Sequence, residues 1–465
     1  MSWRLRGATL AAPFIVLVAA SGLLPAPPAV LAALALGVAL ALLAARQPRA
    51  ALVVATAVVV LVPFYDGRYV TRAIGLTPMS AACIVLLPVA FAKRSRVRWG
   101  ALDVAVLVLV VLRSASLLLN FSNGVGAVIT FLLQLALPYV VFRLLATEVE
   151  TVRALSFTVV ATGTLLALEG IREHNGVPNP FFSLMPPQYQ ASQWARPELR
   201  AGAVRAEASF GHPIAFGMFL ALVLVLTLAL ALTVRAVLAR VALFGALGLC
   251  LLALTGTLSR GPLLVAALGA TAWLLISFRR IAVLRVGALL TVLSAVIVTT
   301  PIAATVDRLV AASTGDTREA RSAQYRLEIL AVVKDPEQFS LLGKPNEDGS
   351  VTAAVYARTG LKSIDSEYAL VYLFAGVLAL AALLAIAALL LEVAARPRLS
   401  PVERAWAVAM AASCLNLLTV ALLTQQSELF WASTAIVAGI GQRHRRVPSA
   451  RAVGGEQGLL PRVPV

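Results

Sequence analysis

Residues 211–232, GHPIAFGMFLALVLVLTLALAL, contain no Asp, Glu, Lys or Arg. Such a stretch is long enough to cross a bilayer, because a spanning helix needs about 20 mainly apolar residues. Similar stretches recur along the chain, which is 60% hydrophobic and only 13% charged, whereas about a quarter of the residues in soluble domains are charged. The apolar excess also excludes a disordered chain. The sequence therefore predicts an all-α, polytopic integral membrane protein.

The apolar stretches predict about 12–14 transmembrane helices. They lie near 8–24, 28–45, 51–65, 78–92, 101–119, 125–145, 154–171, 211–232, 241–257, 261–278, 286–302, 366–391, 405–424 and 429–441. Two long hydrophilic loops interrupt them. The predicted organisation is N-terminal helices (1–171), a first loop (172–210), central helices (211–302), a second loop (303–365), C-terminal helices (366–441) and a basic tail (442–465).

The basic residues predict which side each loop faces. With a cytoplasmic N-terminus and alternating spans, 23 of the 39 basic and six of the 22 acidic residues fall on the inner side, which then holds the whole net charge of +17. Excess Lys and Arg in cytoplasmic loops is the usual orientation signal. The charge therefore predicts membrane lipid as a partner, and no nucleic acid. Both termini are cytoplasmic in this topology, and both long loops and the turn 257–261 face outward.

The three cysteines favour neither a disulfide framework nor a metal site. Cys83, Cys250 and Cys414 all lie in apolar stretches and lack metal-ligand spacing. We expect them to be small packing residues.

Two arginines and a histidine in the outward segments are candidate functional residues. Arg205 and His212 end the first loop, and Arg260 lies in the turn between two apolar helices. A guanidinium stays charged and offers a planar fork that suits phosphate. The structural alternatives are that Arg260 snorkels to the interface and that His212, before Pro213, is a packed helix cap.

Carboxylates precede the next outward-starting span. Asp365, Glu367 and Tyr368 lie at its mouth. A carboxylate there can deprotonate a sugar hydroxyl, although the same residues also favour a helix N-terminus by capping and through its dipole. In the second loop, residues 316–334 predict an amphipathic helix on the outer membrane face, and this helix contains Arg326.

Taken in order, these pieces resemble the O-antigen ligase and polymerase superfamily of bacterial envelope enzymes. The matching pieces are Arg205 through Gly217, Ser259-Arg260-Gly261, Arg326 with Gly343, and Asp365-Ser366-Glu367-Tyr368 entering a span that reaches Gly376. The resemblance covers about residues 200–380. Ligases of the family typically place a histidine where this sequence has Asp365, so the resemblance favours the polysaccharide polymerase branch.

The resemblance implies a glycosyltransferase that joins polyprenyl-pyrophosphate-linked glycan units on the outer side of the cytoplasmic membrane. It implies no cofactor and no metal. Its substrates are a polyprenyl-pyrophosphate-linked oligosaccharide and an acceptor glycan or lipid. A flippase and a chain-length regulator are the implied protein partners.

On this hypothesis each candidate residue has a role. Fixed cations stabilise a departing pyrophosphate best in a low-dielectric site. Arg205 and Arg260 are assigned to the pyrophosphate, and Arg326 to phosphate or the acceptor glycan. The remaining candidates are Asp365 as the favoured general base, Glu367 as the second, His212 as the third, and Tyr368 as a residue that orients the acceptor or anchors the interface.

Other classes of membrane protein stay open. A polysaccharide flippase or other transporter usually has related halves and polar residues near mid-bilayer. No repeat is evident here, and the polar residues gather in the outer segments. Arg113 and Gln134 are the exceptions, because they lie within predicted spans. A polyprenyl-phosphate-sugar glycosyltransferase usually has neighbouring acids in its first outer loop, where Asp66 stands alone. A scaffold protein leaves the two long outer loops unexplained.

Overall fold

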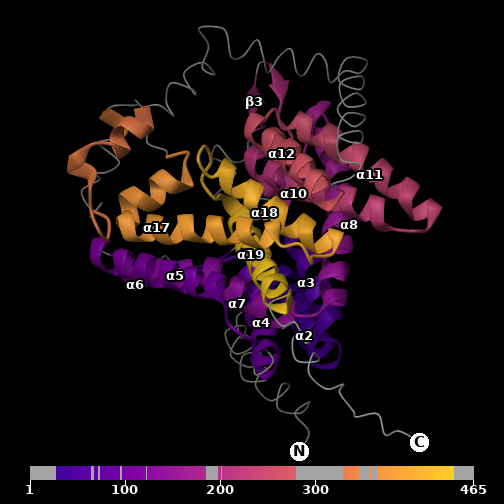
Figure 1. The fold of residues 1–465 in the computed structure, drawn as a ribbon, viewed down its shortest axis with the longest axis horizontal. Helices are drawn as coiled ribbons and strands as arrows, with labels where there is room; N and C mark the ends of the chain where they lie inside the picture. The colour runs from indigo at the N-terminus through magenta and orange to yellow at the C-terminus, as the bar shows by residue number, and fades with distance from the viewer. Residues whose placement is uncertain are drawn as a thin grey trace, which may run out of the picture.

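The computed structural model describes residues 28–63, 68–71, 74–94, 97–121, 123–184, 197–200, 202–278, 328–344, 355–357 and 364–444. This part of the chain is a bundle of helices with two short hairpins (Figure 1). Seven of its helices are long and apolar enough to cross a membrane. The predicted class, an all-α polytopic membrane protein, is confirmed.

The N-terminal half supplies seven α-helices and one hairpin. The helices are α2 (Pro28–Arg46), α3 (Pro48–Leu61), α4 (Pro78–Ala92), α5 (Ala101–Asn120), α6 (Gly124–Phe131), α7 (Leu137–Leu145) and α8 (Val149–His174). A π-helix, η3 (Leu132–Ala136), joins α6 and α7 into one apolar span. The antiparallel strands β1 (Arg68–Thr71) and β2 (Ile74–Leu76) connect α3 to α4.

The rest of the described chain builds the other half of the bundle. Its elements are η4 (Pro180–Leu184), β3 (Leu199–Arg200), β4 (Ala203–Val204), η6 (Ala208–Phe210), α10 (Pro213–Thr233), α11 (Val237–Gly256), α12 (Arg260–Ser277), η7 (Pro336–Gln338), α17 (Glu367–Ala395), α18 (Pro401–Asn416) and α19 (Thr424–His444). In Figure 1, α17 runs alongside α5, which it contacts, and at the other side α11 and α12 both pack against α10.

Helix α10 is the centre of the bundle. It contacts α8, α11, α12, α18 and α19. In its most apolar segment 94% of the residues are buried, whereas in that of α11 only 22% are buried. An uncharged helix suits this position, because it has no group that requires water on any side. The stretch that predicts the fold class therefore forms the core.

Several predicted spans have different limits in the structure. The span expected at 405–424 is α18 and ends at Asn416, and the one expected at 429–441 is α19 and begins at Thr424. The shorter apolar helices include α3 and α4. The spans expected at 8–24 and 286–302 lie outside the described residues, as do most of the second loop and the tail beyond residue 444.

Helix ends with basic residues meet at one end of the bundle. Nε of Arg143 lies 2.7 Å from Oδ1 of Asp103, and Nη2 of Arg443 lies 2.7 Å from Oε1 of Glu403. Arg443 also donates a hydrogen bond to the Thr147 carbonyl at 2.6 Å. These are helix ends that the charge distribution assigns to the inner side.

Segments assigned to the outer side meet at the opposite ends of the same helices. The hydroxyl of Ser209 donates to the Val60 carbonyl at the end of α3, at 2.8 Å. The amide of Glu367, which begins α17, donates to the Leu417 carbonyl after α18, at 3.0 Å. Glu403 and Leu417 lie at opposite ends of α18, so these two sets of contacts are separated along that helix.

Helix α17 breaks at Gly376, and a segment of the second loop fills the break. Gly376 has a φ of +83°, and beyond it the amide of Val377 donates to the Ser340 carbonyl at 3.0 Å. Gly343 also has a φ of +83°, and a Cβ there would overlap the carbonyl of Phe374. The segment around Gly343 therefore docks on a broken helix.

We expect Gly376→Ala to destabilise the protein by about 1–3 kcal/mol, because alanine is strained at this φ. Its Cβ would also overlap the carbonyl of Leu341. Thermal unfolding in detergent measures the change. Gly245→Ala in α11 is the matched control, since a Cβ there meets nothing within 4 Å and alanine favours a helix. Equal losses in both variants would contradict this account.

Candidate functional site

Arg205 holds the turn between α11 and α12. Its Nε donates to the Thr257 carbonyl at 2.9 Å, and its Nη2 donates to the Ser259 hydroxyl at 2.7 Å. The Ser259 hydroxyl makes no capping hydrogen bond to α12, although Ser259 is the N-cap residue. The first amides of α12 therefore lack the side-chain acceptor that a serine usually supplies there.

Arg260 is the first residue of α12 and is exposed. It follows Leu258, which has the unusual φ of +51° and whose carbonyl accepts a hydrogen bond from Nη1 of Arg200 at 2.9 Å. A helix N-terminus attracts anions through its amides and its dipole. The turn thus combines an arginine side chain with a helix N-terminus, and two further arginines brace its backbone.

Glu198 connects Arg205 with His212. Its Oε2 accepts from Nη1 of Arg205 at 2.5 Å, and its Oε1 lies 3.7 Å from Nε2 of His212. His212 is the N-cap of α10, and its Nδ1 accepts the amide of Ile214 at 3.2 Å. In the neutral ring the proton is therefore on Nε2, facing Glu198.

His212 is also within electrostatic reach of Asp365. Burial lowers the pKa of His212, whereas the negative charges of Glu198 and Asp365 raise it. Asp365 is exposed, in the last turn of chain before α17. Asp365 at the mouth of α17 therefore lies near enough to the end of the first loop to influence His212, although about 150 residues separate them in the sequence.

A buried carboxylate at the end of α8 binds the backbone of the first loop between Arg205 and His212. Oε2 of Glu173 accepts the amides of Glu207 and Ala208, both at 2.9 Å. Its Oε1 accepts from the side chain of Asn179 at 3.0 Å. Glu173 thus fixes the backbone between Arg205 and His212, which carries two of the candidate residues.

Glu207 is a second buried carboxyl in the same loop. Burial, followed by the charges of Glu173 and Glu198, raises its pKa from 4.5 to about 9. At neutral pH Glu207 therefore keeps its proton and adds no negative charge to the site.

As the pH rises from about 5 to about 9, we expect the free energy of unfolding to fall more steeply in the wild-type protein than in Glu207→Gln. Across this window the folded protein holds a proton on Glu207 that the unfolded chain has released, so a higher pH favours unfolding. Glutamine does not ionise and removes this contribution. Unfolding midpoints of both proteins in detergent, measured across the window, test the difference, and parallel curves would contradict it.

Glu367 is buried and paired with Arg113 of α5. Nη1 of Arg113 lies 3.1 Å from Oε1 of Glu367, and Oε2 accepts the amide of Leu422 at 3.0 Å. The guanidinium also lies over the ring of Phe131, 5.2 Å from its centroid. Both charges therefore hold α5, α17 and the segment after α18 together.

Ser366 and Tyr368, also at the mouth of α17, make hydrogen bonds within the bundle as well. Ser366 is the N-cap, and its hydroxyl accepts the amide of Ala369 at 3.3 Å. The hydroxyl of Tyr368 donates to the Cys414 carbonyl at 3.0 Å and ties α17 to α18. Asp365 is thus the carboxylate that this mouth presents at the surface.

The sequence-predicted residues fall into three groups. Arg205 and His212 come together through Glu198, Asp365 lies within electrostatic reach of His212, and Arg260 adjoins the turn that Arg205 holds. Glu367 and Tyr368 are bonded within the bundle. Arg326 and Asp66 lie outside the described residues.

Sequence reasoning missed Glu198, Glu173 and the support from Arg200. Their only signal was charge in an outer loop, which many solvated residues share. The three cysteines are buried, as expected for packing residues. Among the described residues, no group of three or more His, Cys, Asp or Glu is placed to hold a metal.

The fold and its apolar helices define a multi-pass membrane protein. No protein-family model and no curated protein matches the chain. Its function is therefore argued from the site.

Proposed function

We propose that this protein is a membrane glycosyltransferase that polymerises or ligates glycan units carried on polyprenyl pyrophosphate. The observation that supports this most is the turn 257–261, where Arg260 and the uncapped N-terminus of α12 lie beside the cluster of Glu198, Arg205 and His212. Pyrophosphate is the anion that this combination suits, because arginine and helix amides both bind phosphate oxygens.

In the proposed reaction Arg260 and the first amides of α12 bind the pyrophosphate. Negative charge grows on the bridging oxygen as its bond to the anomeric carbon breaks, and the fixed positive charge stabilises it. Arg205 is engaged with Thr257, Ser259 and Glu198, so we assign it to positioning the turn rather than to contacting phosphate.

Asp365 is the proposed general base. It takes the proton of the acceptor hydroxyl as that oxygen bonds to the anomeric carbon, and the carrier leaves as the polyprenyl pyrophosphate. A carboxylate exposed at the mouth of a span can reach an acceptor that arrives along the membrane surface. In the predicted topology this site lies on the outer side of the cytoplasmic membrane.

A transporter of lipid-linked glycans is the alternative, and the break in α17 favours it, because transporters use discontinuous helices. Purified protein in liposomes with polyprenyl-pyrophosphate-linked oligosaccharide distinguishes the functions. Longer polymer indicates a polymerase, and transfer to a distinct acceptor indicates a ligase. Movement across the bilayer without a new glycosidic bond would contradict the proposal and indicate a flippase.

A further inference from the structure

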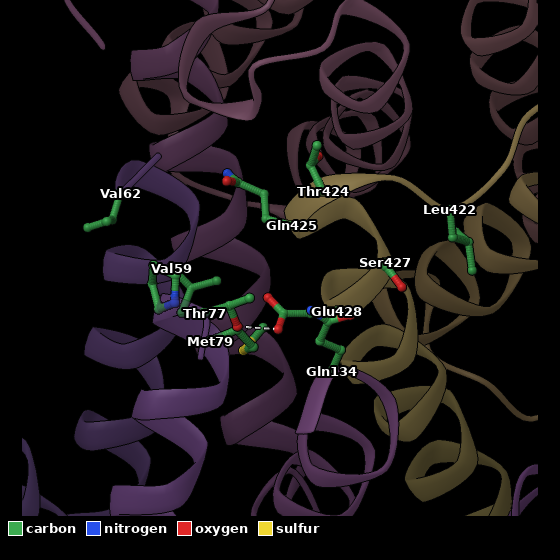
Figure 2. Close-up of a pocket in the computed structure, with 11 residues that line it drawn as sticks. Val59, Val62, Thr77, Met79, Gln134, Leu422, Thr424, Gln425, Ser427 and Glu428 are labelled. Carbon is green, nitrogen blue, oxygen red and sulfur yellow. Dashed lines mark hydrogen bonds between the residues drawn. The ribbon is translucent and has the colours of Figure 1, made fainter. Parts of the chain in front are cut away.

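A cavity of about 130 Å³ lies among α3, α4, η3 and α19. Figure 2 shows the carboxyl group of Glu428 pointing across it toward Thr77, with Gln425 on one side and Gln134 on the other. Val59 and Met79 supply apolar wall. Gln134, one of the two intramembrane polar residues noted in the sequence, lies in the π-helix η3, and π-helical turns are frequent at functional sites.

Glu428 is a buried carboxyl held by hydroxyl groups. Its Oε1 accepts hydrogen bonds from the hydroxyls of Thr77 and, at 3.1 Å, Ser80. Only 2% of Glu428 is exposed, and no ion pair joins it to another described residue. A buried carboxyl without a cationic partner is costly, so it indicates a function.

The cavity contains buried polar atoms that lack a hydrogen-bond partner among the described residues. Oε1 of Gln425 and Oγ1 of Thr424 are buried and have no hydrogen-bond partner within the described part of the chain. Gln425 itself is only 4% exposed. None of the described residues that line the cavity is Lys or Arg. Such a wall favours an uncharged ligand that forms hydrogen bonds, and it disfavours an anion, which would have no cation to pair with among these residues.

The size of the cavity decides between ligands. A single water needs a cavity of only about 10–15 Å³. A bare ion is of similar size, so in this cavity it could not contact opposite walls at the same time. Sites for whole small molecules are about 300–1,000 Å³. The cavity is thus the size for one ring of a larger molecule.

The cavity adjoins the candidate site. Nε2 of Gln425 donates to the Val60 carbonyl at 3.3 Å, and that carbonyl also accepts from Ser209 in the loop that contains Arg205. The amide of Leu422, which lines the cavity, donates to Glu367 at the mouth of α17. A basic turn for the phosphate end and a polar cavity without Lys or Arg among its described lining residues therefore lie on the same side of the bundle.

We propose that this cavity binds one uncharged sugar ring of the glycan, whose hydroxyl groups donate hydrogen bonds to Glu428 and Gln425. The ring's C–H faces pack against Val59 and Met79. The inference rests on the proposed function for the identity of the glycan. It adds a specificity: the ring in this cavity is neutral, and a uronic acid or phosphate-bearing ring is excluded.

Alkylation of Ser427→Cys, which lines the cavity, tests the binding. Protein in nanodiscs is treated with a small thiol reagent alone, with polyprenyl pyrophosphate, with a neutral polyprenyl-pyrophosphate-linked oligosaccharide, or with its uronic acid counterpart. We expect the neutral glycan to slow alkylation roughly fivefold or more, and the other two ligands to leave it unchanged. Leu418→Cys, exposed and outside the cavity, is the control, and the unsubstituted protein gives the background.

Two substitutions test the wall. Glu428→Gln keeps the shape, and we expect it to raise the KM for neutral lipid-linked glycan roughly tenfold with little change in kcat. Gln134→Ala should act in the same direction, and no hydrogen bond joins Gln134 to another described side chain, so its removal spares the fold.

The outcomes separate this inference from the proposed function. Suppose that Arg260→Ala loses transfer, while neutral glycan does not protect Ser427→Cys and both wall variants keep the wild-type KM. That result overturns the sugar site and leaves the glycosyltransferase. Protection by neutral glycan in a wild-type protein that forms no glycosidic bond keeps the sugar site and overturns the glycosyltransferase. Equal protection by polyprenyl pyrophosphate alone overturns the sugar site.

Discussion

Arg260→Ala is expected to abolish glycan transfer, lowering kcat/KM by about 10²–10³ or more. The substitution removes the exposed guanidinium at the start of α12 but leaves the contacts of Arg205 with Thr257 and Ser259, which shape the turn. The turn should therefore keep its fold, which thermal unfolding of the variant in detergent checks. Product formation from polyprenyl-pyrophosphate-linked oligosaccharide by the purified variant measures the effect.

Arg260→Lys and Arg240→Ala are the matched controls. Lysine keeps the charge without the planar fork, so we expect partial activity from it. Arg240 is an exposed arginine near the opposite end of α11, where it donates to the Val234 carbonyl, and its loss should leave transfer intact. Wild-type polymer from Arg260→Ala would reject the site. Labelling of Arg260→Cys from the cytosol alone would reject the orientation.

The fold class was predictable because apolar length is a local property of the chain. The stretch 211–232 needs no knowledge of its neighbours to be recognised as a membrane helix, and its lack of charge is also why α10 takes the centre. The basic helix ends were predictable in the same way. Neither inference depends on which residues meet in space.

The limits of the spans were harder to predict from the sequence, because they depend on tertiary contacts. The break at Gly376 exists where a segment around Gly343 supplies backbone partners, and the two glycines lie in separate parts of the sequence. A single glycine in an apolar stretch predicts no such contact. The early start of α19 likewise brings the polar residues Gln425 and Glu428 into the bundle, where the hydroxyls of Thr77 and Ser80 donate hydrogen bonds to Glu428.

The site was predictable in its residue types but not in its pairings. Arg205 and His212 were named from the sequence, and Glu198 connects them, whereas Asp365 is linked to them only through its charge effect on His212. Glu367 was the second candidate base after Asp365, yet it is paired with Arg113, which lies in a different helix. Charge alone does not indicate which of two neighbouring carboxylates points into the bundle, because that depends on how α5 packs against α17.

Asp365→Asn is expected to lower kcat by about 10²–10⁴ with little change in KM. The other carboxylates near the site are occupied. Glu367 is paired with Arg113, Glu198 with Arg205, and Glu173 accepts three hydrogen bonds beneath the loop. Asparagine has nearly the shape of aspartate but cannot accept the proton of an acceptor hydroxyl at neutral pH.

A second variant shows whether the loss comes from the chemistry. Asp365→Glu retains the carboxylate, so we expect it to recover part of the activity that Asp365→Asn loses, whereas a cap or an interface contact would not require a charge. Glu198→Gln should act differently, because it loosens Arg205 and His212 and so raises the KM as well. If Asp365→Asn retains wild-type turnover while Glu198→Gln loses it, the base is Glu198 or the His212 that it contacts.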